Sequence, residues 1–95
     1  MRLNKAYIER RFERIATLLQ WNTGAAWTRN GKGNSHAIIG ATFIENVPVY
    51  GGWQINQMAN EGGGQNTILP RRMKAAELDA WFSGVEFGFE AARRV

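Results

Sequence analysis

The sequence predicts a small α+β domain in which N-terminal and C-terminal amphipathic helices flank a small antiparallel β-sheet of two to three strands. Apolar residues recur at helical spacing over residues 3–20 and again over about 72–93, which predicts the helices. Nine of the eleven glycines lie between positions 24 and 64, where no helical period is present, which predicts the sheet. We expect residues 1–95 to form one domain, because two domains of half this length would each lack a self-sufficient core.

The first predicted helix spans residues 3–20. Its core-facing stripe occupies positions i, i+4, i+7 and i+11, which are Ile8, Phe12, Ile15 and Leu19. Charged side chains occupy the opposite face, where Lys5 and Glu9 have the spacing of a helical ion pair. Residues 22–24 are predicted to end the helix, with Gly24 as a left-handed cap.

The glycine-rich middle of the chain predicts short strands. We expect a strand at residues 25–28, a turn at 29–34, and a central strand at 36–45, because 36–45 is apolar on both faces. Residues 50–59 are predicted as its partner, and the pair Gly51-Gly52 indicates a bulge or a close backbone approach. Residues 60–66 are predicted as a loop.

Pro70 introduces the second predicted helix, from about Arg72 to Arg93, whose core-facing stripe is Leu78, Trp81, Phe82, Val85 and Phe89. Small residues recur every four positions along it, at Ala76, Ala80, Gly84, Gly88 and Ala92. Glycine costs about 1 kcal/mol relative to alanine inside a helix, so this ridge indicates close packing. The ridge packs either within the chain or in a symmetric contact between two copies. The candidate interface residues are Ala80, Gly84, Phe87 and Gly88.

The residues that carry chemistry predict no enzyme. The only histidine, His36, has no serine, cysteine or second histidine in a nucleophile–base arrangement with it. No pair of candidate ligands has a spacing usable for a metal, and neither glycine run matches a nucleotide-binding fingerprint. The carboxylate pairs Glu77/Asp79 and Glu86/Glu90 are interpreted as solvated helix faces. We therefore expect no catalytic residue, no metal and no cofactor.

Positive charge suggests an anion site. The net charge is +4, and three bases cluster at the start of the second helix, where cations oppose the helix dipole. A bound phosphate or carboxylate would explain them, and screening by solvent is the alternative. Aromatic residues next to bases, as in residues 27–29, are also typical of nucleic-acid surfaces, although in a small domain they are often core. The candidate ligand-binding residues are Arg29, Lys32, Asn60, Gly62, Gly63, Gly64, Asn66, Arg71, Arg72 and Lys74.

Three stretches of the chain resemble small accessory proteins of tailed bacteriophages and prophages. They are Tyr50-Gly51-Gly52-Trp53-Gln54-Ile55, the run Asn60-Glu61-Gly62-Gly63-Gly64, and the spacing Arg72…Leu78…Trp81…Gly84. Together with Trp27-Thr28-Arg29 the resemblance covers residues 21–84. It implies a phage gene acting on host defence, host metabolism or phage DNA, and it implies no catalytic residues.

Two functions follow as hypotheses. The first is a non-catalytic binding module for a phosphate-bearing ligand, either nucleic acid or a signalling nucleotide. The alternative is a protein–protein interaction factor that inhibits a host enzyme or immune complex, and a homodimer is a further expectation. Residues 1–5 lead directly into a charged helix, and no apolar run approaches the roughly 20 residues of a membrane span, so we expect a cytoplasmic protein without membrane contact.

Overall fold

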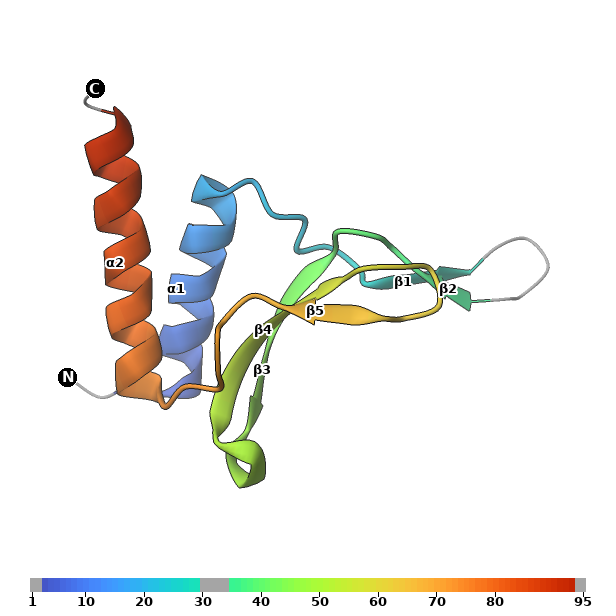
Figure 1. The fold of residues 1–95 in the computed structure, drawn as a ribbon, viewed down its shortest axis with the longest axis horizontal. Helices are drawn as coiled ribbons and strands as arrows, with labels where there is room; N and C mark the ends of the chain where they lie inside the picture. Colours follow the sequence, from blue (N-terminus) through green and yellow to red (C-terminus); the bar gives the residue numbers. More distant parts are fainter. Residues whose placement is uncertain (1–2, 30–34, 94–95) are drawn as a thin grey trace.

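The computed structural model describes residues 3–29 and 35–93, which form two helices and two small antiparallel sheets (Figure 1). This confirms the predicted α+β class with a helix near each end. In chain order the elements are α1 (Lys5–Leu18), β1 (Trp27–Arg29), β2 (Ser35–Ala37), β3 (Thr42–Val47), the 3-10 helix η1 (Pro48–Tyr50), β4 (Gly52–Met58), β5 (Gln65–Thr67) and α2 (Ala75–Arg93).

The two helices lie side by side, and the strands extend away from them as an arm that ends in β1 and β2 (Figure 1). The molecule measures 47 × 39 × 22 Å, and its radius of gyration is 15.0 Å. A compact domain of this length would have a radius of gyration of roughly 12 Å. The arm therefore exposes strand and loop surface that a compact packing would cover.

Helix α1 begins and ends with identifiable caps. At its start, the Asn4 side chain accepts a hydrogen bond from the Tyr7 N–H at 2.8 Å. At its end, the left-handed residue is Gln20, with a φ of 57°, so the predicted cap at Gly24 is wrong. The Trp21 N–H bonds back to Ala16 at 2.8 Å, as in a Schellman motif, and the Trp21 ring packs on Phe12. Packing of Trp21 thus ends the helix before Gly24.

The prediction of one central strand over residues 36–45 is wrong. Gly40, with a φ of 88°, turns the chain between β2 and β3, which pair with different partners. The central strand is β4, which pairs with β3 on one side and β5 on the other. Residues 36–45 are apolar on both faces because Ala37 and Ala41 pack on Met58, whereas Ile44 packs against the main core.

Strand β4 confirms the predicted partner strand and its close approach at Gly52. Trp53 and Ile55 face the helices, and on the other face the Gln54 side chain accepts the Leu69 N–H at 3.0 Å. A Cβ added to Gly52 would lie 2.6 Å from the carbonyl oxygen of Met73, so this position requires glycine. The predicted loop over residues 60–66 is too long by two residues, since β5 begins at Gln65.

The main core lies between α1, α2 and β4. Its buried residues are Ile8, Phe12, Ile15, Trp53, Ile55, Leu69, Met73, Leu78 and Phe82. Helix α2 begins at Ala75, three residues later than predicted, because Met73 pairs with Trp53 in an antiparallel bridge and is therefore not helical. This bridge fixes the start of α2 against the central strand.

Candidate functional site

The predicted ligand-binding residues do not form one site. Arg29 lies on β1 and residues 60–64 form the turn beside it, both on the arm, whereas residues 71–74 lie at the start of α2 (Figure 1). The turn and β1 are in contact, because a Cβ added to Gly63 would lie 2.8 Å from the ring of Trp27. Lys32 lies outside the described residues. The candidate ligand-binding residues are therefore divided between the arm and the start of α2.

The polar groups of the glycine turn are largely used within the fold. The Asn60 side chain accepts the Gly64 N–H at 2.9 Å, and the Gly64 carbonyl accepts the Ala59 N–H at 2.7 Å. The Glu61 carbonyl accepts the Ala37 N–H at 2.9 Å and so attaches the turn to β2. Asn60 and Gly64 therefore shape the turn, while Asn66 lies on exposed β5.

Arg71 and Arg72 at the start of α2 are compensated by carboxylates. Arg71 pairs with Glu77, and the Arg72 guanidinium lies 2.7 Å from Glu45 and donates to the Gly52 carbonyl at 3.0 Å. The hydrogen bond from Arg72 lowers the pKa of Glu45, and the one from Arg71 lowers the pKa of Glu77. Glu77 also supplies the acid that the helix dipole favours in a first turn. A bound phosphate is not needed to explain these arginines.

Among the residues that the structure describes, the small-residue ridge of α2 is exposed. Ala76, Ala80, Gly84, Gly88 and Ala92 are all exposed. Within residues 3–29 and 35–93, apart from the helix's own nearby backbone, no atom lies within 4 Å of a Cβ added to Gly84 or Gly88. Phe87, beside the ridge, is 77% exposed. Of the two alternatives for the ridge, packing within the chain is contradicted over the part of the chain that the structure describes.

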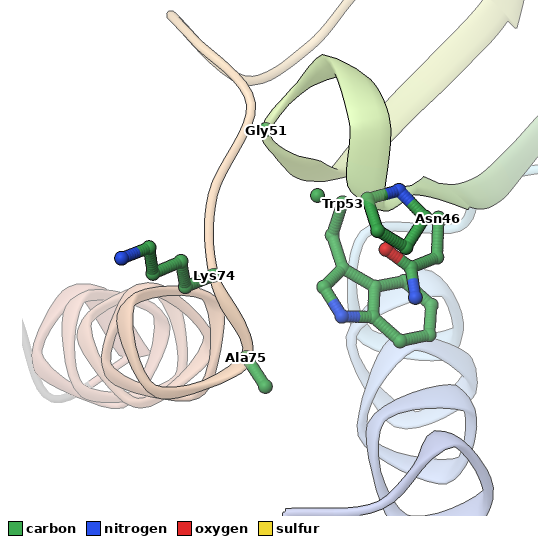
Figure 2. A pocket seen from close by; sticks show the side chains of 7 residues that line it. Asn46, Gly51, Trp53, Lys74 and Ala75 are labelled. Carbon is green, nitrogen blue, oxygen red and sulfur yellow. The ribbon is translucent and has the colours of Figure 1, made fainter.

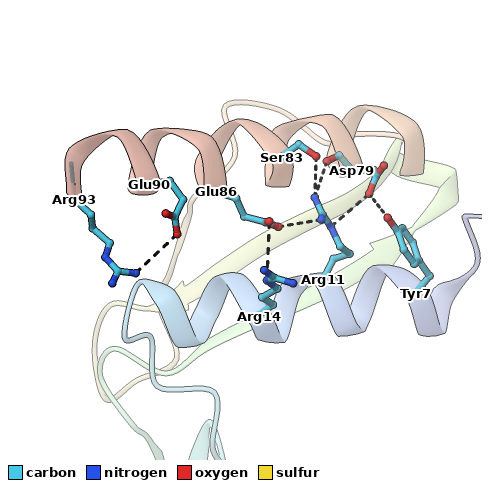
Figure 3. A network of polar contacts seen from close by, with 8 residues as sticks. All are labelled: Tyr7, Arg11, Arg14, Asp79, Ser83, Glu86, Glu90 and Arg93. Carbon is cyan, nitrogen blue, oxygen red and sulfur yellow. Dashed lines mark hydrogen bonds and ion pairs between the residues drawn. The ribbon is translucent and has the colours of Figure 1, made fainter. Parts of the chain in front are cut away.

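Helix α1 instead contacts a polar edge of α2 (Figure 3). Arg11 donates to Ser83 Oγ at 2.9 Å, and its guanidinium lies 3.0 Å from Glu86 and 3.5 Å from Asp79. The Tyr7 hydroxyl donates to Asp79 at 2.9 Å, and this hydrogen bond raises the pKa of Tyr7. Sequence reasoning missed this network, because its members are about 70 residues apart along the chain. It joins the two helices, and its opposite charges compensate each other.

The remaining predicted groups make no further site. His36 lies opposite Thr28 in the β1–β2 pair. Within residues 3–29 and 35–93, no group of three potential ligands could hold a metal ion, and no helix is long and apolar enough to cross a membrane. Comparisons with protein-family models, curated proteins and solved structures find no significant match to this chain. The resemblance to phage accessory proteins stays a prediction.

Proposed function

We propose that this chain is a non-catalytic protein-interaction module, and that the outer face of α2 binds the same face of a second copy. The outer face consists of Ala76, Ala80, Gly84, Phe87, Gly88 and Ala91, all of them exposed. It lies opposite the core residues Leu78 and Phe82, where a surface helix normally carries charge. A face of five small residues with an exposed phenylalanine, charged only at Glu77 near its N-terminal end, is the observation that carries the proposal.

The spacing of the outer face fits a helix–helix contact. Residues at every fourth position form a ridge, and ridges of this kind interdigitate when two helices cross at about −50°. The absence of side chains at Gly84 and Gly88 would let the two helix backbones approach closely. In a two-fold contact, Phe87 of each copy would pack beside the glycines of the other.

The size of this face predicts a modest affinity. It runs along about 22 Å of helix, from the rise of 1.5 Å per residue between positions 76 and 91. A contact limited to one helix from each copy falls at the low end of specific interfaces, near or below about 1,200 Å² in total. We therefore expect a dimer that dissociates on dilution.

Sedimentation equilibrium over a range of protein concentrations tests this proposal. The wild-type chain of 10.7 kDa should approach twice that mass as the concentration rises. Gly88→Glu places a charge on the outer face and should leave a folded monomer at every concentration. Ala6→Glu places the same charge on an exposed position of α1 and should dimerise like the wild type.

Two results would overturn it. A wild-type chain that stays monomeric at the highest soluble concentration removes the second copy as the partner. A dimer that survives Gly88→Glu places the contact elsewhere. A melting temperature for Gly88→Glu close to that of the wild-type monomer shows that the substitution acts on association rather than on folding.

The arm supports a second candidate function, binding of a phosphate-bearing ligand such as single-stranded nucleic acid. Trp27 is 49% exposed, and Arg29 follows it on the same face of β1. A half-exposed indole next to a base can stack on a nucleobase while the guanidinium contacts phosphate. Binding of an oligonucleotide should weaken as salt rises and should be lost in Trp27→Ala. An oligonucleotide affinity that changes neither with salt concentration nor in Trp27→Ala would exclude this function.

A further inference from the structure

A pocket of about 360 Å³ lies between the end of the β3–β4 hairpin and the start of α2 (Figure 2). It is lined by Asn46, Pro48, Gly51, Gly52, Trp53, Lys74 and Ala75. Its volume falls in the range of small-molecule sites, about 300–1,000 Å³. None of these residues belongs to the outer face of α2, so this site is independent of the self-association proposed above.

The backbone around the pocket is held firmly. Trp53 and Met73 exchange two backbone hydrogen bonds, at 2.8 and 2.9 Å, which fix the start of α2 to β4. Arg72 adds a bond to the Gly52 carbonyl and an ion pair with Glu45 on β3. The pocket is thus bordered by three connected segments, and a ligand could bind there without first ordering a loop.

Trp53 presents an unpaired donor to this pocket. Only 6% of the residue is exposed, and among the described residues its indole N–H makes no hydrogen bond; the nitrogen itself is not fully buried and is therefore open to solvent. Figure 2 shows the ring nitrogen on the side that faces Ala75 and the space between them. An indole N–H that is open to a pocket can donate to an acceptor atom of a bound ligand.

The charges around the pocket favour a ligand with one negative charge. Lys74 forms no ion pair with any described residue, and no carboxylate lines the pocket. Arg71 and Arg72 are nearby, but Glu77 and Glu45 compensate them. Lys74 is near Glu77, whose pKa it helps to lower, but Glu77 is also paired with Arg71, so a net positive charge remains at this end of α2. One such charge matches a carboxylate better than a doubly charged phosphate.

We propose that this pocket binds a small carboxylate with a flat apolar body. One carboxylate oxygen accepts the indole N–H of Trp53, and the ammonium of Lys74 balances the charge. Lys74 extends away from Trp53 in Figure 2, and its flexible stem lets the ammonium swing towards the pocket. Pro48 and Ala75 supply apolar wall for the body of the ligand.

Benzoate, benzamide and inorganic phosphate are suitable probes, with binding followed by ¹H–¹⁵N NMR of the full chain. Benzamide has the shape of benzoate without its charge, and phosphate has charge without an apolar body. Benzoate should shift the Trp53 indole signal, assigned by its loss in Trp53→Phe, along a saturating curve. The amide signal of Ala75 should follow the same curve. Benzamide and phosphate should bind at least about tenfold more weakly, the scale of one charge-assisted hydrogen bond.

Lys74→Met and Trp53→Phe test the two donors. Each should weaken benzoate binding by about tenfold, while Lys5→Met, which removes an exposed lysine from α1, should have no effect. Lys74 is exposed, so Lys74→Met should also keep the wild-type melting temperature. An unchanged melting temperature of Lys74→Met shows that any loss of benzoate binding is not caused by unfolding.

Four outcomes would overturn the proposal. Benzoate that causes no saturable shift removes the site. Benzamide that binds as well as benzoate makes the pocket an apolar cavity without charge selection. Phosphate that binds more tightly than benzoate makes the ligand class wrong, and unchanged affinity in Lys74→Met removes the lysine. None of these results bears on dimerisation through α2, so the two proposals fail separately.

Discussion

Replacing Gly52 by alanine should lower the free energy of unfolding by about 3 kcal/mol, and the structure divides this cost into two parts. Gly52 has a φ of 115°, a conformation that costs a residue with a Cβ about 1–3 kcal/mol. The new Cβ would also lie 2.6 Å from the Met73 carbonyl oxygen, which accepts the Trp53 N–H at 2.8 Å. Moving that carbonyl away weakens a backbone hydrogen bond worth about 1 kcal/mol.

Gly51→Ala is the matched control for this substitution. Gly51 has a φ of 104°, but the nearest atom to its added Cβ is the Arg72 Cβ at 3.6 Å, which is an ordinary contact. This variant should lose only the conformational part, the same cost of about 1–3 kcal/mol. The difference between the two variants therefore measures the close approach of β4 and the segment before α2.

Urea denaturation followed by circular dichroism gives both free energies by linear extrapolation. A loss of about 3 kcal/mol corresponds to a fall in melting temperature of roughly 12–24 °C for a domain of this size. Equal stability of Gly51→Ala and Gly52→Ala would show that the close approach costs nothing. A Gly52→Ala variant as stable as the wild type would refute the reasoning for the hairpin as a whole.

Three further predictions concern the core, a cap and an ion pair. Phe82→Ala removes a fully buried ring and should cost about 3–5 kcal/mol in urea denaturation, whereas a loss below about 1 kcal/mol would place Phe82 outside the core. Asn4→Ala removes the cap of α1 and should cost about 1 kcal/mol, and Asn4→Ser should restore most of it. The hydrogen bond from Arg72 lowers the pKa of Glu45 in the folded state. The stability that this ion pair adds to the fold is therefore complete above the ordinary glutamate pKa and is lost as the pH falls through the lowered pKa. Melting temperatures below about pH 4.5 should therefore fall less steeply in Glu45→Gln than in the wild type.

Local patterns predicted the helices and the hairpin because short-range physics determines them. Ile8, Phe12 and Ile15 lie on one face when residues 5–18 are helical, so burying them together requires a helix. The pair of glycines before Trp53 permits a close approach of two backbone segments. The split of residues 36–45 was missed because the left-handed turn at Gly40 leaves no mark on the apolar pattern. Two different cores each required apolar residues in that segment, so it resembled one buried strand.

The candidate site was harder to predict, since its charges are balanced by distant residues. Arg72 pairs with Glu45, which is 27 positions away, and Arg71 pairs with Glu77, which is six positions away and outside the helical i,i+4 spacing. From sequence alone both arginines counted as free positive charge. Once they are paired, Lys74 becomes the cation of interest, and Trp53 on β4, which lines the same pocket, could be identified only from the fold.

Helix α2 shows how an apolar pattern can be correct and still be assigned to the wrong partner. Leu78 and Phe82 are fully buried against α1 and β4, which accounts for one stripe of the helix. Phe87 lies five residues after Phe82, about 140° further around the helix axis, so both rings cannot face the same core on a straight helix. A helix that is apolar on two faces is stable when both faces are covered, and the described residues of this chain cover only one. The small residues beside Phe87 then have a physical reason if another helix packs there, which is why self-association is tested first on this face.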